Sequence, residues 1–459
     1  MRRALKLLSL PSTVLLACLS VLPAPASGQQ PAAAPPDGVA AGDELKITVG
    51  EAFRAQYRLA FPATRSGLPV ETAAAAGQID STLRQDLLNS RAFAIQGPDA
   101  LAVIETTGDL ARDFELYRSL GNELLLQIDV LDEENQVVLE GRVFDLASGD
   151  SLLGKRYRGE ASVARRMAHS LADEIVLLLT GRRGLSLTTI AFNSDRQAPN
   201  QIKEIYLMDA DGQNQRAVTA HKTISLSPTW SAAGDAVAYT SFFSATPGIY
   251  LVDLVNGQKS PLVTEGSFNA SPTLSPDGLQ IAFARTFPGG NIEIVIADRS
   301  GGNLQRITNS RGIDTNPSWS PTGRQIAFTS ARSGSPQIYV MDAEGTNVRR
   351  VSPGGKYNDG AAWSPDGKRI AYAQRAGTDR FDIVVVDVIT GEKRQLTSGP
   401  ASHETPSFSP DGLKIALASK YGSGVGATQI YVMDEDGSNA QRLTSDGNNF
   451  SPSWSGYVP

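Results

Sequence analysis

The sequence is poor in cysteine and histidine, with one cysteine and three histidines in 459 residues. His169, His221 and His403 form no cluster with each other or with Cys18, which excludes the common zinc-binding patterns. Cys18 lies in a leader segment that we expect to be removed, so the mature chain would carry neither a thiol nor a disulfide.

The motifs of common enzymes are missing as well. There is no G-x-S-x-G nucleophile elbow, and no glycine-rich phosphate loop follows a strand and opens a helix. Residues 149–152 spell GDSL, but that hydrolase chemistry also needs Asp-x-x-His, and no histidine has an aspartate three positions before it. A hairpin turn explains the tetrapeptide better. We therefore expect no catalytic residue, no metal and no cofactor.

An excess of positive charge is also absent. The chain has 42 basic and 48 acidic residues, a formal charge of -6. Proteins that bind nucleic acid or anionic lipid by electrostatic attraction carry a basic face, so the balance argues against both.

The first 26 residues have the three parts of a secretory signal peptide. Three cations precede a mostly apolar run at 7–22, and residues 24–26 read Ala-Pro-Ala, a small-residue cleavage site. Cleavage would leave 39 basic and 48 acidic residues, a balance of -9. The mature protein is thus predicted to be periplasmic, with no membrane insertion. Two alternatives stay open: a membrane anchor formed by the apolar run, and lipid attachment at Cys18.

Residues 27–54 are predicted to be a flexible amino-terminal segment. Its first part, 27–42, is rich in Ala, Pro and Gly. The following heptapeptide at 43–49, DELKITV, alternates like a short strand and could add to the edge of a sheet as a switch. Its candidate partner-binding residues are Glu44, Leu45, Ile47 and Val49.

Residues 55–183 predict a compact α/β domain with helices on one face of a mixed sheet. Helices are expected at about 72–90, around 114–120, and at 163–178, where Gly181 closes the last one. Strands are expected at 57–61, 93–95, 124–131, 137–146 and 152–157.

Residues 184–459 form a repeat array whose period is 44 to 46 residues. Each unit has an aromatic-Ser strand and a second strand of Ile-Ala-Phe type, and a Pro-Asp-Gly-like turn joins them in the five complete repeats. A third strand ends in Asp, and a fourth carries an apolar-Thr/Ser pair. The aromatic-Ser strands begin at Pro228, Pro272, Pro317, Ala361, Pro406 and Pro452. Four short strands per period are typical of a β-propeller blade.

The two ends of the array complement each other. Residues 189–192 form a second strand with no aromatic-Ser strand before it, and 451–455 form an aromatic-Ser strand with no second strand after it. Joined, they complete one sheet. We therefore predict an α/β amino-terminal domain followed by a six-bladed propeller closed by its C-terminal strand.

Two repeated features have a structural explanation as well as a functional one. The Asp at the end of the third strand, as in Asp342 and Asp434, could suggest calcium, but an Asp before a Gly-containing turn usually caps the hairpin. The aromatic ladder could form a ligand cage, but packing between blades explains it better. The ladder consists of Trp230, Trp319, Trp363, Phe408 and Trp454.

The repeats resemble the PD40 (WD40-like) repeat of the TolB family. The consensus S-P-x-W-S-P-D-G-x-x-I-A-F is almost literal at 317–328 and 361–372. Together with the signal peptide and the α/β domain, the resemblance covers essentially the whole mature chain. It implies a non-enzymatic, monomeric periplasmic adaptor of the Tol–Pal system. The propeller mouth would bind a Pal-like peptidoglycan-associated lipoprotein, and the amino-terminal segment a TolA-like inner-membrane protein, in support of outer-membrane integrity and cell division. The Pro/Ala-rich lead-in departs from the family pattern and leaves the position of the switch segment in question.

The connections from each fourth strand to the next first strand must emerge on one face. Polar residues in these connections, three positions before the aromatic-Ser strand, would ring the central channel, although Asn and Asp there could also only bind loop backbone. The predicted partner-binding residues of this mouth are Phe268, Asn269, Arg311, Asp314, Tyr357, Asn358, His403, Glu404 and Asn449.

Two rival classes remain at this stage. A propeller hydrolase or lyase would need His403 beside a carboxylate such as Asp314 or Asp359. A propeller that binds a small ligand or glycan would bind its ligand saturably without a protein partner.

Overall fold

The structure is a computed structural model that describes residues 56–69, 72–104, 107, 109–198, 201–244, 246–420 and 426–457. The predicted signal peptide, Cys18 and the strand-like 43–49 segment with Glu44, Leu45, Ile47 and Val49 lie outside these residues. Within them, no helix is long and apolar enough to cross a membrane.

The amino-terminal domain is built on a mixed sheet with the strand order β3-β1-β4-β5-β6. β1 pairs in parallel with β3 and β4, whereas β4, β5 and β6 form an antiparallel meander, and the short β2 pairs with β4. The elements in chain order are β1 (Tyr57–Ala60), β2 (Arg65–Ser66), α1 (Ala73–Ser90), β3 (Phe93–Gln96), α2 (Pro98–Leu101), α3 (Leu110–Ser119), β4 (Leu124–Glu133), β5 (Gln136–Asp145), β6 (Ser151–Gly159), η1 (Ala161–Val163) and α4 (Ala164–Thr180).

The long helices α1 and α4 pack side by side on one face of this sheet, as expected. Gly181 adopts φ 69° at the end of α4, a left-handed conformation that glycine reaches without steric cost. The expectation that all helices share one face was incomplete. Phe114 and Tyr117 of α3 bury a second cluster against Leu125 and Phe144, residues of β4 and β5 that alternate away from α1 and α4. The GDSL tetrapeptide lies in and just after the β5–β6 turn, as predicted.

The rest of the chain forms six four-stranded antiparallel sheets, which confirms the predicted six-bladed propeller. From the inner to the outer strand, the blades are β30-β7-β8-β9 (Asn449–Trp454, Thr189–Ser194, Glu204–Asp209, Arg216–Ala217), β10-β11-β12-β13 (Ser225–Trp230, Ala236–Ser241, Gly248–Asp253, Lys259–Val263), β14-β15-β16-β17 (Asn269–Leu274, Gln280–Thr286, Ile292–Asp298, Gln305–Arg306), β18-β19-β20-β21 (Asp314–Trp319, Gln325–Ser330, Gln337–Asp342, Arg349–Arg350), β22-β23-β24-β25 (Asn358–Trp363, Arg369–Arg375, Phe381–Asp387, Lys393–Gln395) and β26-β27-β28-β29 (Ser402–Phe408, Lys414–Lys420, Gln429–Asp434, Gln441–Arg442).

The C-terminal strand closes the ring. β30 pairs with β7 in antiparallel register, with Trp454 opposite Ile190, and also contacts the neighbouring inner strands β10 and β26. The Trp454 indole donates a hydrogen bond to the Thr188 hydroxyl at 2.9 Å. β30 supplies the fourth strand of the first blade, so β7 has no long unpaired edge in the part of the chain that the structure describes.

The repeated residues have structural roles. The five ladder aromatics are each 7–9% exposed and pack between adjacent blades, which confirms the packing interpretation. The Asp residues cap turns: Asp342 accepts from the Asn347 side chain, and Asp411 accepts from the Leu413 backbone N–H at 3.0 Å. The described residues contain no group of three or more His, Cys, Asp or Glu placed to hold a metal.

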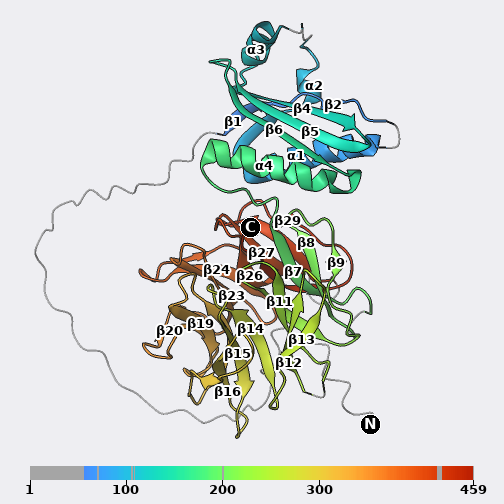
Figure 1. Cartoon of the computed structure of the whole chain (residues 1–459). Helices are drawn as coiled ribbons and strands as arrows, with labels where there is room; N and C mark the ends of the chain where they lie inside the picture. The colour runs from blue at the N-terminus through green and yellow to red at the C-terminus, as the bar shows by residue number, and fades with distance from the viewer. Residues whose placement is uncertain are drawn as a thin grey trace, which may run out of the picture.

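The amino-terminal domain sits on one end of the propeller axis (Figure 1), with α1 and α4 facing the ring. Ion pairs cross this boundary. Arg165 of α4 meets Asp209 and Asp211 of the first blade, and Arg91 at the end of α1 meets Asp434 of the sixth. The described part of the amino-terminal domain leaves the opposite end of the ring uncovered.

Candidate partner-binding face of the propeller

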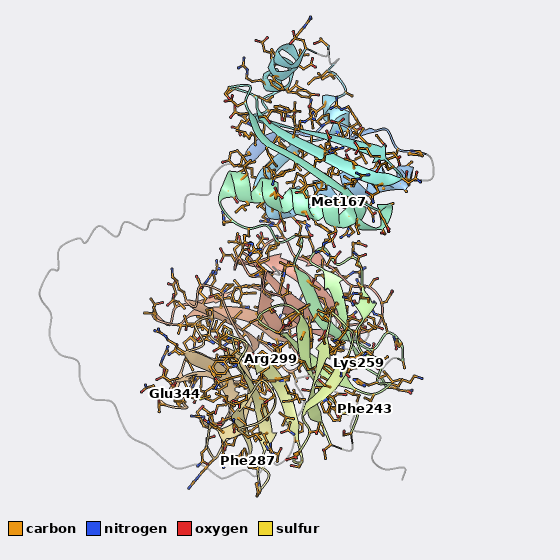
Figure 2. The ribbon with its side chains drawn as sticks, viewed as in Figure 1. Met167, Phe243, Lys259, Phe287, Arg299 and Glu344 are labelled. Carbon is orange, nitrogen blue, oxygen red and sulfur yellow. The ribbon has the colours of Figure 1, made fainter. Side chains whose placement is uncertain are left out.

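The open end of the propeller carries two sets of loops. These are the connections from each outer strand to the next inner strand, and the loops between the second and third strands of each blade. In Figure 2, Phe243 and Phe287, both in loops of the second set, lie far from Met167 of α4. This face is thus remote from the amino-terminal domain, and we call it the mouth.

A depression in the mouth runs across the second to fifth blades, whose inner strands are β10, β14, β18 and β22. Aromatic and aliphatic side chains form most of its wall, among them Phe242, Phe268, Ile313 and Tyr357. Asp359 is the one aspartate or glutamate in its lining, and the lining contains no lysine or arginine. Its cavity volume is about 80 Å³.

Four of the predicted mouth residues are accessible on the surface of the mouth. Phe268 and Tyr357 are half-buried and line the depression, Arg311 is exposed, and Glu404 is half-buried on β26. The Arg375 guanidinium lies 4.8 Å from the centre of the Tyr357 ring, and Phe381 meets that ring edge-on at 5.6 Å. These contacts fix Tyr357 in place. Burial raises the pKa of the Tyr357 hydroxyl, so it stays a neutral hydrogen-bonding group.

The other predicted mouth residues do not line an open channel, contrary to expectation. Asn269, Asp314, Asn358 and Asn449 are fully buried, and His403 is 9% exposed. The three asparagines donate to the backbone oxygens of their own loops, as in the alternative considered for them. The sequence could not distinguish a residue that lines the channel from one that bonds to the backbone of its own loop, because both positions require a short polar side chain at the start of the inner strand.

These buried residues bond within and between blades. Asp314 accepts from Arg332 of its own blade at 3.0 Å, whereas Asn358 donates to Gln337 of the preceding blade at 2.6 Å. Gln337 also accepts from the Ser352 hydroxyl at 2.8 Å. The fourth-strand Thr/Ser seen in the repeats is therefore part of the same buried network.

One surface cluster was not found from the sequence. Phe243 is 60% exposed, and its ring lies 4.9 Å from that of His221. His221 hydrogen bonds to the Tyr239 hydroxyl at 2.7 Å, and Tyr250 packs against Phe243 at 6.3 Å. Burial lowers the pKa of His221, which favours the neutral ring. The loop that carries Phe243 joins second and third strands, and such loops have no common pattern among the repeats.

The histidine-carboxylate pair required by the rival enzyme does not form. His403 Nδ1 is buried without a hydrogen-bond partner among the described residues. Asp314 is paired with Arg332, and Asp359 accepts from Asn316 and Thr329. Burial, with a smaller contribution from Arg380, lowers the pKa of His403 to about 4.

Comparison with known proteins agrees with this architecture. A family model described as "TolB beta propeller domain" matches residues 176–458. The chain is 32% identical over 220 residues to the "Protein TolB homolog" of Chlorobium chlorochromatii (strain CaD3), and 36% identical over 197 residues to the "Tol-Pal system protein TolB" of Bordetella pertussis. These alignments cover 48% and 43% of this chain and 49% and 44% of those relatives, so the chain spans about half the length of the curated relatives it matches.

A solved structure extends the likeness beyond the propeller. The crystal structure of TolB from Acinetobacter baumannii matches with a TM-score of 0.73 and 26% identity, over 88% of this chain and 98% of that chain. A ring of six blades with an α/β domain on one end and a loop-built mouth on the other defines a two-domain propeller protein. The chain belongs to the TolB propeller family.

Proposed function

We propose that the chain is a periplasmic scaffold of a Tol–Pal system that binds proteins and catalyses no reaction. Its mouth binds a Pal-like peptidoglycan-associated lipoprotein, and its amino-terminal segment binds a TolA-like inner-membrane protein. In this way it supports outer-membrane integrity and constriction during cell division.

The observation that carries the proposal is the composition of the mouth. Interface hot spots are enriched in aromatic side chains and arginine, and the mouth presents Phe243, Phe268, Tyr357 and Arg311 on a rigid ring. Family membership supports the choice of system, since a curated relative is itself called a Tol-Pal system protein. The absence of a His403-carboxylate pair weighs against the hydrolase or lyase alternative.

Capture from envelope extract tests the proposal. The mature chain should retain a Pal-like lipoprotein, and Phe268→Ala or Tyr357→Ala should reduce the retained amount at least tenfold, about 1.4 kcal/mol or more. Val103→Ala, a substitution of an exposed residue in the other domain, is the matched control. Capture that is unchanged in both mouth variants would contradict the assignment of the mouth.

A second experiment tests whether the mouth and the amino-terminal segment bind different partners. Deleting residues 27–50 should abolish binding of a TolA-like protein and leave lipoprotein binding intact. Loss of both partners together would refute that division. Saturable binding of a glycan by the mature chain alone would favour the small-ligand alternative instead.

A further inference from the structure

Asp359 is a buried carboxylate at the wall of the mouth depression. It lies on the inner strand β22 and is 4% exposed. The residues in the same register of the other inner strands are Leu226, Ala270, Thr315, Glu404 and Phe450, so an acidic group occupies this position in the fifth and sixth blades and not in the other four.

Among the described residues, the hydrogen bonds to Asp359 come from neutral donors. The Asn316 amide, the Thr329 hydroxyl and the Gly360 N–H each donate to the same oxygen, Oδ1, at 2.7 Å. None of the ion pairs in the described part of the chain involves Asp359. Burial accordingly raises its pKa.

Two other buried carboxylates of the propeller have a counter-ion. Asp314, in the preceding blade, pairs with Arg332 at 3.0 Å, and Glu293 pairs with Arg306 at 2.8 Å; both acids are 0% exposed. A buried charge is costly unless a charge of opposite sign compensates it. Asp359 has no such counter-ion in the described part of the chain. The buried Glu204 of the first blade likewise accepts only from neutral donors, the Thr219 hydroxyl and the Lys222 N–H, but Glu204 does not line the depression.

The surroundings of Asp359 suit a cation with an apolar stem. Phe268 and Tyr357 line the same depression, and aromatic faces attract ammonium and guanidinium groups. Burial, with smaller contributions from Asp359 and from Glu404 of the next inner strand, raises the pKa of the Tyr357 hydroxyl. With a cavity volume of about 80 Å³, the depression has room for the end of a side chain.

We propose that the depression receives the ammonium or guanidinium group of a lysine or arginine side chain from the protein partner, with Asp359 as its counter-ion. This inference rests on the proposed function, because it assigns the chemistry of the partner at the same mouth.

A small probe tests this subsite without the lipoprotein. Saturation-transfer NMR on the mature chain should detect n-pentylammonium in the depression and give a signal at least fivefold stronger than that of 1-pentanol, which has the same stem without the charge. Equal signals for the two probes would overturn the proposal, and this comparison needs no variant.

Substitution then assigns the signal to one carboxylate. Asp359→Asn keeps the shape and can still accept the three hydrogen bonds, and it should remove most of the n-pentylammonium signal. Asp366→Asn, in a half-exposed turn of the same blade, should leave that signal unchanged. Retention of the signal in Asp359→Asn would overturn the proposal. Thermal unfolding of each variant checks the fold.

Lipoprotein binding separates this inference from the proposed function. If both hold, Asp359→Asn should weaken the affinity about tenfold and flatten its dependence on salt. Lipoprotein binding that is equally tight in Asp359→Asn would contradict the inference alone. Absence of lipoprotein binding by the wild-type chain would contradict the proposed function, while the amine probe would still report on the subsite.

Discussion

Arg165 of α4 lies against Asp209 of the first blade, with 3.2 Å between the guanidinium Nε and the carboxylate Oδ2, and so joins the two domains. The same guanidinium pairs with Asp211 and donates to Thr82 of α1 at 3.4 Å. Arg165 is only 14% exposed, so this contact is screened less than a surface ion pair.

We expect Arg165→Ala to loosen the domain boundary. Removing the guanidinium leaves two acids close together without their cation, at a cost of about 2 kcal/mol. Differential scanning calorimetry should show one unfolding transition in the wild type and two, or a broadened one, in Arg165→Ala. Arg58→Ala, which removes a largely exposed pair with Glu123, serves as the control and should leave the transition unchanged. A sharp single transition in Arg165→Ala would show that this pair does not couple the domains.

Ring closure makes Trp454 a stability determinant. Its side chain is 7% exposed between the first and last blades, so Trp454→Ala should lower the free energy of unfolding by about 3–5 kcal/mol. Chemical denaturation measures the change. Phe243→Ala, at an exposed aromatic residue, should change the free energy of unfolding by less than about 0.5 kcal/mol. Similar losses of unfolding free energy in the two variants would contradict closure of the ring by the C-terminal strand.

The stability of the fold should fall in acid through His403. Its folded pKa of about 4 lies below the ordinary value of 6.5, so the unfolded chain binds the proton first. The contribution of the neutral ring is complete above pH 6.5 and is lost as the pH falls towards 4, by about 3 kcal/mol in all. In His403→Gln, the loss between pH 6.5 and 4 should be smaller by about that amount in urea denaturation. Parallel stability curves for wild type and variant would contradict this assignment.

The buried Thr308 hydroxyl should also contribute to the free energy of unfolding. It donates to Glu293 at 2.6 Å and accepts from the Ile294 N–H at 2.9 Å. Thr308→Val leaves both groups short of a partner and should cost about 1–3 kcal/mol of unfolding free energy. Thr346→Val, in a largely exposed turn with a long 3.4 Å contact to Asp342, should cost little. Equal effects at the two sites would exclude a stabilising network.

The propeller could be predicted from the sequence because each blade repeats the same local chemistry at a constant spacing. Pro-Asp-Gly turns, alternating strands and the ladder aromatics all indicate the same unit, and the two incomplete ends indicate closure. In the amino-terminal domain, the four-residue α2 and the two-residue β2 were missed, because such short elements leave no periodic pattern.

The mouth was harder to predict, because depth is not visible in a local pattern. Asn269 and Asn358 look like channel residues in the sequence, yet the packing of neighbouring blades buries them. Phe243 was missed because its loop differs from blade to blade. Tyr357 and Phe268 were found because aromatic residues in these connections stand out against polar neighbours.

Hydrogen-deuterium exchange of the mature chain, with and without the captured lipoprotein, tests the central claim most directly. The account predicts slower exchange on binding in the mouth connections 265–271, 309–316 and 353–360 and in the loop that carries Phe243, without change at the turns on the α4 side. Protection confined to those turns or to the amino-terminal domain would contradict it.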